Sequence, residues 1–348
     1  MKKHPLPDST AEFDKMLTVS PNPHIRSRET TPSLMLCVII ALLPAAVWGV
    51  YQFGLRALMI MIVSIVSCVG AEALSALVLK LKFSINDLSA VVTGLLLALN
   101  LPVSVPLWMP AVGGVFAIVI VKQLFGGIGK NFLNPALCAR VFLFSWAGEM
   151  TYFTTPKTAL PLFSSDIDAV STATPLASLN AGALPGIPII DLFIGKQPGC
   201  IGEVSALLLL AGGLFLIIRK VISVRIPLAF IGTVFALTYF FPLGDQDVHY
   251  AVASVFSGAL FLGAFFMATD YTTSPCTPIG QIIYGVGCGA LTVLIRYFGG
   301  YPEGVSFAIL IMNLFVWFID KYTKPTPFGH VKPEKPKKPK KAKGGEAE

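Results

Sequence analysis

The chain contains few charged residues. Asp, Glu, Lys and Arg make up 13% of its 348 residues, against about 25% in ordinary soluble domains. Hydrophobic residues account for 54%, and the mean hydropathy is +0.73. This composition excludes a disordered chain and a water-soluble globule, because so few charges could not cover so much apolar surface. We therefore predict a polytopic membrane protein.

Residues suited to metal or nucleophilic chemistry are also scarce. The six cysteines are scattered without a C-x-x-C pair, so we expect buried structural thiols and no iron–sulfur cluster held by this chain alone. The four histidines lie in tails or loops, where they offer neither a haem pair within the membrane nor a nucleophilic triad. We predict no metal site and no catalytic residue.

Basic residues outnumber acidic ones, 26 to 19. Nine of the basic residues follow Ile319 in a Pro/Lys tail, and most of the others flank apolar runs. This distribution argues against nucleic acid as a partner and favours a role in membrane topology. We expect the tail to be disordered, with membrane lipids as a secondary contact.

Ten apolar stretches follow one another along the chain. A spanning helix needs about 20 mostly apolar residues. Eight stretches suit spans, namely Ser33–Phe53, Leu55–Leu79, Leu107–Phe125, Gly202–Ile218, Ile226–Pro242, Ala251–Thr269, Ile279–Phe298 and Val305–Ile319, and two are shorter, Leu88–Leu101 and Ala136–Ala147. With ten spans and both termini in the cytoplasm, 22 of the 26 basic residues, including Lys122 and Arg140, fall on the cytoplasmic side. Arg56, Lys157, Lys196 and Arg296 are the exceptions.

A long polar segment divides these stretches into two sets of five. We predict a cytoplasmic N-terminal segment (1–32), a first five-helix half (33–148), an extracytoplasmic loop (149–201), a second five-helix half (202–319) and a basic cytoplasmic tail (320–348). An odd number of helices per half inverts the second copy. Each half also has a Gly-bearing apolar run that ends in a polar, Pro-containing one, as in Val92–Pro102 and Phe256–Pro275, which is typical of broken helices in inverted repeats. The predicted fold is thus all-α, with about ten transmembrane helices in two inverted five-helix repeats.

Two short motifs are more specific. The polar loop contains Asp168-Ala-Val-Ser-Thr-Ala-Thr174, and Phe125-Gly-Gly-Ile-Gly-Lys-Asn-Phe-Leu-Asn-Pro-Ala136 follows the fourth stretch in the chain. The first resembles the flavinylation motif D-x-x-[S/T]-x-A-T, and the second resembles the F-G-G-x-G-x-N-x-x-N-P-A segment of the same family. With the five-plus-five layout, they make Ser33 to Lys321 similar to the D subunit of Rnf ion-translocating oxidoreductase complexes and to its relative, the B subunit of the sodium-translocating NADH:quinone reductase.

The first resemblance implies a covalent flavin. A flavin transferase would esterify the Thr174 hydroxyl with the phosphate of FMN, while the small Ala173 leaves room for that enzyme and Asp168 orients the loop. Thr172 stands where the family commonly has Gly, and it competes as an acceptor, as does Ser171. A plain Ser/Thr-rich loop that ends in a Thr-Pro turn is the alternative.

The second resemblance implies a further, non-covalent flavin, riboflavin in the quinone-reductase relative. Amides at Asn131 and Asn134 suit the polar edge of its ring, and glycines at Gly126, Gly127 and Gly129 allow a close backbone approach. Alternatively, this segment only breaks one helix and opens the next at Asn-Pro.

Two acidic residues lie in or beside apolar runs, Glu72 and Asp270. Ionisable residues at such positions suggest a cation path by default, and pairing with a neighbouring polar group is the alternative.

These expectations define a function. The resemblance implies a membrane electron-transfer subunit of an ion-translocating ferredoxin:NAD⁺ oxidoreductase in the bacterial inner membrane, which exports Na⁺ or H⁺. Ferredoxin, NAD and iron–sulfur chemistry would reside in other subunits, so the chain would be enzymatic only within the assembly. The alternatives are a secondary transporter or channel with the same inverted architecture, or the quinone-reductase B subunit.

Overall fold

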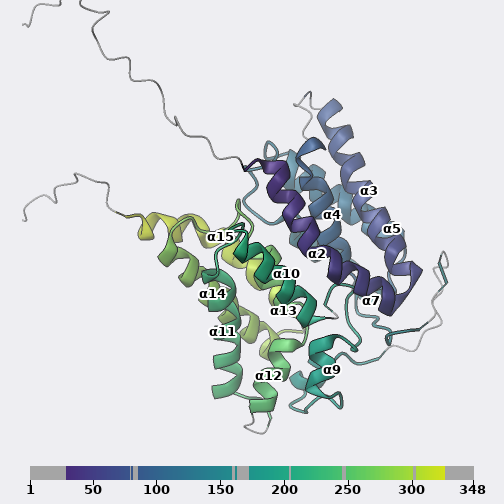
Figure 1. The fold of residues 1–348 in the computed structure, drawn as a ribbon, viewed down its shortest axis with the longest axis vertical. Coiled ribbons are helices and arrows are strands. Elements are labelled where there is room, and N and C mark those ends of the chain that lie inside the picture. The colour runs from purple at the N-terminus through teal and green to yellow at the C-terminus, as the bar shows by residue number, and fades with distance from the viewer. Residues whose placement is uncertain are drawn as a thin grey trace, which may run out of the picture.

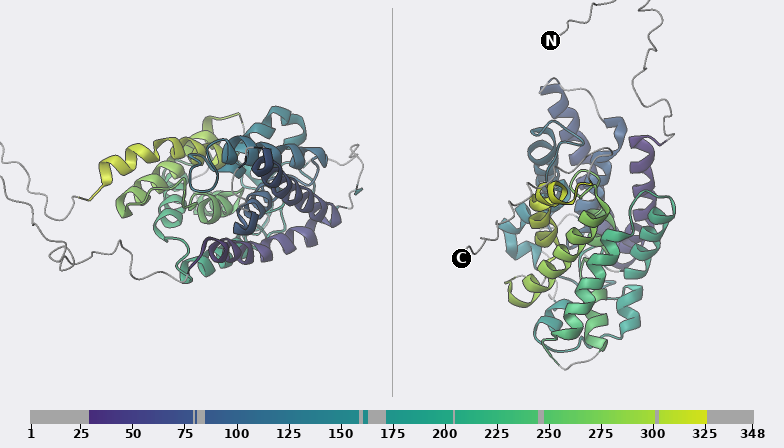
Figure 2. Two further views of the ribbon diagram at one scale, coloured as in Figure 1. Left: turned by 90° about the horizontal axis from the view of Figure 1, so that it is seen from above. Right: turned by 90° about the vertical axis from the view of Figure 1, so that its left-hand side faces the viewer.

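The computed structural model describes residues 29–78, 80, 85–158, 161–162, 172–203, 205–244, 248–300 and 303–325. Every regular element in these ranges is a helix. Figure 1 shows α2 to α5 gathered in one part of the molecule and α10 to α15 in the other, with α2 beside α10, and Figure 2 gives two further views. The prediction of an all-helical chain is confirmed for the described residues.

Four helices are long and apolar enough to cross a bilayer: α2 (Thr31–Phe53), α3 (Leu55–Val78), α14 (Pro278–Phe298) and α15 (Val305–Thr323). A fifth span is formed if α12 (Val248–Phe256) is joined with α13 (Leu260–Leu262) and the π-helical η4 (Gly263–Met267), which bend by 62° at the break. The chain therefore has the composition and the helices of a polytopic membrane protein.

Shorter apolar helices account for the remaining predicted stretches. They are α4 (Ser89–Leu99), α5 with the π-helical η2 (Trp108–Val115 and Phe116–Gln123), α6 (Pro135–Leu143), α10 (Ala206–Ile218) and α11 (Arg225–Phe240). Each of the ten predicted apolar stretches thus coincides with a helix or a helix pair. Short helices complete the described elements: η1 (Ile85–Asp87), η3 (Phe144–Trp146), α7 (Ala147–Met150), α8 (Pro175–Asn180) and α9 (Ile189–Ile194).

Four helices begin with the same local signal. A Thr or Asn whose side chain accepts from the first-turn backbone precedes a Pro at the start of α2, α6, α8 and α14. The side chain satisfies a backbone N–H that the helix leaves free, and Pro has no N–H to lose there. The two residues are adjacent at α6, α8 and α14, and at α2 one residue separates them; in each case they mark where the helix begins.

Large apolar side chains are exposed along the outer faces of the long helices. Val47 is 64% exposed, Val66 63%, Trp317 64% and Phe298 84%. Many polar side chains, in contrast, are buried inside the molecule. This distribution is expected where lipid surrounds the helices, since hydrocarbon solvates apolar groups and leaves polar ones to find partners within the protein.

Two buried arginines satisfy backbone carbonyls at or just beyond the ends of apolar helices. Arg56 of α3 donates to the carbonyls of Val103 and Val105 (2.9 and 3.1 Å), which follow the end of α4. Arg296 of α14 donates to those of Ser254 and Ser257 (2.7 and 3.1 Å) where α12 ends. A backbone carbonyl without a partner at membrane depth is costly, so each arginine stabilises the chain where a helix ends.

The polar segment between the two sets of helices is not a simple loop. Its helix α8 contributes Leu176 and Leu179, and α9 contributes Leu192, to an apolar cluster with Tyr250 of α12. The segment is therefore anchored on the second set of helices. The predicted motif residues Asp168 and Ser171 lie outside the described residues, as does most of each terminal segment.

Candidate functional site

A cavity of about 330 Å³ lies between the two sets of helices. This volume falls in the range of about 300–1,000 Å³ that is usual for small-molecule sites. Its apolar wall comes from α2, α4 and η4 and includes Leu34, Leu96, Phe265 and Phe266. Its polar lining comes from several elements: Ser89, Thr93, Lys122, Asn131, Asn134, Thr269, Asp270 and Thr272.

The structure brings Asn131, Asn134 and Asp270 together at this cavity. Asn131 Nδ2 donates to Thr272 Oγ1 (3.0 Å), and Asp270 Oδ2 accepts from Thr272 Oγ1 (2.9 Å) and from Thr273 Oγ1 (3.2 Å). A hydrogen-bonded chain thus joins the segment before α6 to the segment after η4. Such a chain orders polar groups from both sets of helices around one space.

Asn134 has a structural task as well. Its Oδ1 accepts from the backbone N–H groups of Ala136 (3.0 Å) and Leu137 (3.3 Å), which caps α6, and its Nδ2 donates to the Met267 carbonyl (3.3 Å). The alternative interpretation, in which Asn-Pro opens a helix, is therefore present in the structure, although Asn134 also lines the cavity.

The three glycines of the same motif shape the chain before the cavity. Gly126, Gly127 and Gly129 have φ of +103°, +89° and +85°, which only glycine adopts without strain. They reverse the chain after η2 so that Asn131 can reach the cavity. The cavity lining includes Ile128 of this turn and none of the three glycines.

Glu72 lies in an ion pair. Lys122 Nζ is 2.7 Å from Glu72 Oε1 and 2.6 Å from Ser89 Oγ, and Gln123 Nε2 donates to the same carboxylate oxygen (3.2 Å). Glu72 is 0% and Lys122 3% exposed. Pairing, one of the two alternatives for Glu72, is thus observed, and it occurs at the wall of the cavity, since Ser89 and Lys122 line it.

Four cations of the topology count are buried within helices. Lys122 and Arg140, which the count places on the cytoplasmic side, lie in η2 and α6 and form ion pairs. Arg56 and Arg296, which the count places on the other side, lie in α3 and α14. All four therefore contribute to packing inside the protein, and the side of the membrane on which each lies stays a prediction.

Thr174 is half-buried at the start of α8. Its Oγ1 accepts from the Ala177 N–H (3.3 Å). The competing Thr172 differs, because its Oγ1 donates to the Phe153 carbonyl (3.3 Å) and its N–H donates to the same oxygen (3.0 Å). Ala173 between them is exposed. An ester at Thr174 would leave the observed hydrogen bond intact, whereas an ester at Thr172 would abolish the one that its hydroxyl makes.

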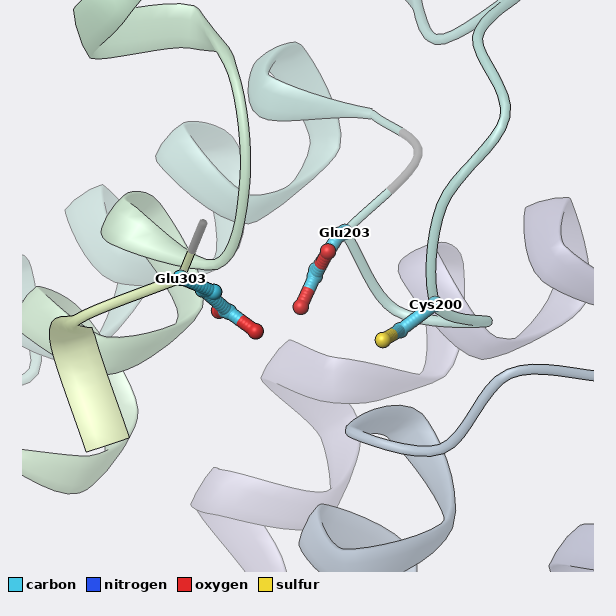
Figure 3. Close-up of side chains that lie close together, drawn as sticks. All are labelled: Cys200, Glu203 and Glu303. Carbon is cyan, nitrogen blue, oxygen red and sulfur yellow. The ribbon is translucent and has the colours of Figure 1, made fainter. Parts of the chain in front are cut away.

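A second, smaller cavity of about 30 Å³ adjoins Thr174. Glu203, which precedes α10, and Glu303, which precedes α15, line it together with Gln197. The side chains of Glu203, Glu303 and Cys200 point toward one another from two different loops (Figure 3), with their ligand atoms within 4.8 Å of each other. No sequence motif marks these residues; a charge directly beside an apolar run is the available signal.

Arg140 is the cation of this cluster. Its Nη2 contacts Glu303 Oε2, Glu203 Oε1 (3.4 Å) and Cys200 Sγ (3.6 Å). Its Nη1 donates to Asn100 Oδ1 (2.8 Å) and to Ser306 Oγ (3.0 Å). A buried guanidinium thus contacts all three groups, so a side chain of the protein itself offsets the charge of the cluster.

The charge balance of the cluster affects its protonation. Burial, and next the charge of Glu303, raise the pKa of Glu203 to about 8. Burial also raises the pKa of the Cys200 thiol, which keeps that group neutral. At neutral pH the cluster therefore favours one carboxyl in its acid form.

Apolar outer faces, a bent helix pair and a ligand-sized, mostly apolar cavity between two sets of helices together define a polytopic membrane protein with an internal cavity. The chain belongs to the NQR2, RnfD, RnfE family, whose family model matches residues 18–329.

Named relatives extend over nearly the whole chain. It is 51% identical over 326 residues to the D subunit of the Na(+)-translocating ferredoxin:NAD(+) oxidoreductase complex of Acetobacterium woodii, a match that covers 92% of this chain and 97% of the relative. It is 42% identical to the D subunit of the proton-translocating ferredoxin:NAD(+) oxidoreductase complex of Clostridium ljungdahlii (90% and 96%). It is 36% identical to the D subunit of the ion-translocating oxidoreductase complex of Halorhodospira halophila (89% and 95%).

Proposed function

We propose that the chain is the D subunit of an Rnf-type ion-translocating ferredoxin:NAD⁺ oxidoreductase in the bacterial cytoplasmic membrane. Full-length similarity to subunits that carry this name supports the proposal and favours it over the quinone-reductase B subunit. The observation that carries it is the presence in one membrane chain of a threonine suited to esterification and of a ligand-sized cavity with an apolar wall and a few polar groups. Ferredoxin and NAD would be handled by partner subunits.

The proposed topology has ten spans, with both termini in the cytoplasm and two inverted repeats. The four long helices, the bent pair, the four shorter apolar helices and α6 supply ten apolar segments. The two buried arginines that satisfy backbone carbonyls at or just beyond helix ends, Arg56 in the first set and Arg296 in the second, support a repeated design. Membrane lipids would contact the exposed apolar faces of these helices.

Thr174 is the proposed attachment point of FMN, which a flavin transferase would install through its phosphate. A flavin supplies one-electron chemistry when bound. Thr174 fits this role because its oxygen is used only as an acceptor in the contacts described above, and an ester oxygen still accepts. The covalent bond would hold the cofactor on a polar segment from which a dissociable flavin would be lost.

The large cavity is the proposed site of a second, non-covalent flavin, riboflavin. Phe265 and Phe266 offer aromatic surface for a flat ring, and Asn131 and Asn134 offer amide groups for its polar edge. Asp270 belongs to the same polar lining, joined to Asn131 through Thr272, and is the proposed contact to a cation path, whereas Glu72 is neutralised by Lys122. Because relatives of both Na⁺ and H⁺ types are similar to this chain, similarity does not select the ion.

A denaturing gel tests the covalent flavin. Protein produced together with a flavin transferase should give an ultraviolet-fluorescent band, which Thr174→Ala abolishes and the matched control Thr172→Ala retains. Peptide mass spectrometry should locate the FMN phosphate on Thr174. A colourless wild-type protein, correctly inserted and made with the transferase present, would refute the electron-transfer role and favour a transporter or channel.

Extraction tests the second flavin. Denaturation of purified Thr174→Ala protein should release flavin in a ratio of about one per chain, because the large cavity is unaffected by that change. Absence of extractable flavin from protein that remains folded would refute the second site.

A further inference from the structure

The small cavity beside Thr174 contains a carboxyl pair that electron transfer alone does not require. Glu203 and Glu303 come from loops about 100 residues apart in the chain, yet their carboxylate oxygens lie within 4.8 Å of each other and both contact Arg140 Nη2. Thr174 and Gln197 line the same cavity. A group carried by Thr174 and the carboxyl pair therefore share one small space.

Several elements packed against the carboxyl pair contribute charged or titratable side chains. Arg140 from α6 contacts both carboxylates, and Arg296 from α14 is buried nearby, where it donates to the carbonyls of Ser254 and Ser257 instead of to a carboxylate. The remaining titratable neighbours are the thiol of Cys200 and the phenols of Tyr250 and Tyr297. A single guanidinium thus contacts two carboxylates, and two adjacent carboxylates resist full ionisation.

Unused polar atoms surround the same space. Gln197 is 2% exposed, and its Nε2 donates toward the carbonyls of Glu203 and Phe256 (3.4 and 3.5 Å), while its Oε1 has no hydrogen-bond partner. Ser257 Oγ is likewise buried without a hydrogen-bond partner. Because buried polar atoms normally have partners, the orphaned acceptor of Gln197 indicates a donor that is not part of the chain. A volume of about 30 Å³ is enough for a water molecule.

We propose that Glu203 and Glu303 share one exchangeable proton, connected to water in the small cavity, and that the ionised pair takes up this one proton when the group on Thr174 is reduced by one electron. This inference rests on the proposed flavinylation of Thr174. The electron comes from a low-potential donor, either a partner subunit or dithionite, and stays on the carried group. The proton comes from solvent water, and an O–H bond forms on one carboxylate, so that the charge of the electron is offset. Glu203 and Glu303 are positioning residues in this step, because they hold the compensating proton near the carried group and do not react with it.

Infrared spectroscopy of the full-length protein tests the proton-holding part without any flavin. The carboxylic-acid band of buried Glu should titrate near pH 8 and shift in heavy water. It should be lost in Glu203→Gln and in Glu303→Gln, each of which leaves Arg140 with one carboxylate. Asp191→Asn is the matched control, because Asp191 is a partly exposed carboxylate of the same segment, 3.5 Å from Lys196.

Three results would overturn this part. The first is that no carboxyl titrates between pH 6 and 10 in the wild-type protein. The second is that the carboxylic-acid band survives in both Gln variants. The third is that the titration shifts when sodium replaces potassium. The last result would assign the site to a sodium ion. Since the wild-type measurement needs no substitution, a variant that fails to fold does not prevent the test.

Redox difference spectra test the coupling. At pH 8, reduction of flavin-loaded protein should increase the carboxylic-acid band, and the increase should disappear in Glu203→Gln. Thr174→Ala should lose the increase but keep the static titration. An unchanged band on reduction of a fluorescent, flavin-loaded chain refutes the coupling. A chain without covalent flavin refutes the proposed function and the coupling together, while its static titration still decides whether the pair holds a proton.

Discussion

Replacing Lys122 with methionine should strongly destabilise the protein. Lys122 Nζ lies 2.7 Å from Glu72 Oε1, and both side chains are at most 3% exposed. Methionine keeps most of the length of the lysine stem but removes the charge, which leaves the Glu72 carboxylate without its cation. Removing one partner of a buried ion pair costs about 3–5 kcal/mol.

The double variant separates charge from packing. In Lys122→Met with Glu72→Gln the buried carboxylate is absent, and Gln123 Nε2 and Ser89 Oγ remain nearby as polar partners. Replacing a buried pair with neutral groups is often nearly neutral. We therefore expect the double variant to regain most of the stability that the single variant loses.

Thermal unfolding in detergent measures both effects. At about 2 °C per kcal/mol for a chain of this size, the single variant should unfold about 6–10 °C below the wild-type protein and the double variant within a few degrees of it. A single variant that unfolds within 1 °C of wild type would refute the assignment of a buried, mutually dependent pair. So would a double variant as unstable as the two single variants combined.

Three further changes have defined outcomes, all measurable by thermal unfolding. The folded chain holds the proton of Glu203 up to about pH 8, whereas the unfolded chain releases it near pH 4.5. The unfolding temperature should therefore fall as pH rises through this interval and level off above it. An equal dependence of the unfolding temperature on pH in Glu203→Gln would contradict this. Asn134→Ala should cost about 1 kcal/mol through loss of the α6 cap, in addition to the lost hydrogen bond to the Met267 carbonyl, and Asn134→Ser should restore the capping part; equal losses would exclude capping as a cause. Gly258 and Gly54 share a φ of +76°, but only at Gly258 would a new Cβ lie 3.2 Å from Arg296 Nη2. Both Gly258→Ala and Gly54→Ala should cost at least about 1 kcal/mol, and Gly258→Ala should be the more destabilising. Equal effects would show that packing around Gly258 is loose.

The helices could be predicted from the sequence because lipid-facing helices require long apolar runs and because Thr-Pro and Asn-Pro mark their starts. The break at Ser257-Gly258 was also predictable, since the apolar run there is interrupted by residues that favour turns. The membrane crossings of the short helices were not confirmed, because helices such as α6 span only nine residues and length alone does not fix their depth.

The site could be predicted in part. Sequence patterns indicate Asn131, Asn134 and Asp270 separately, and the structure places all three at one cavity. The same patterns do not indicate Lys122, Arg140, Glu203 or Glu303 as site residues. The acidic partners of the two cations lie 50 to 163 positions away in the chain, and no local periodicity encodes such a pairing, which depends on how the helices pack.

The contacts of Arg140 also have a consequence during synthesis. Its partners Glu303 and Ser306 follow it by 163 and 166 residues. At about 5–20 residues per second, the ribosome delivers these partners roughly 8–33 s after α6. For the first 63 residues of that interval no acidic partner of the arginine exists, and after Glu203 is made the arginine still lacks Glu303 and Ser306. The last helix to be made therefore completes the charge balance of the middle of the protein, and a chain truncated before Glu303 should be recognised and degraded by membrane quality control.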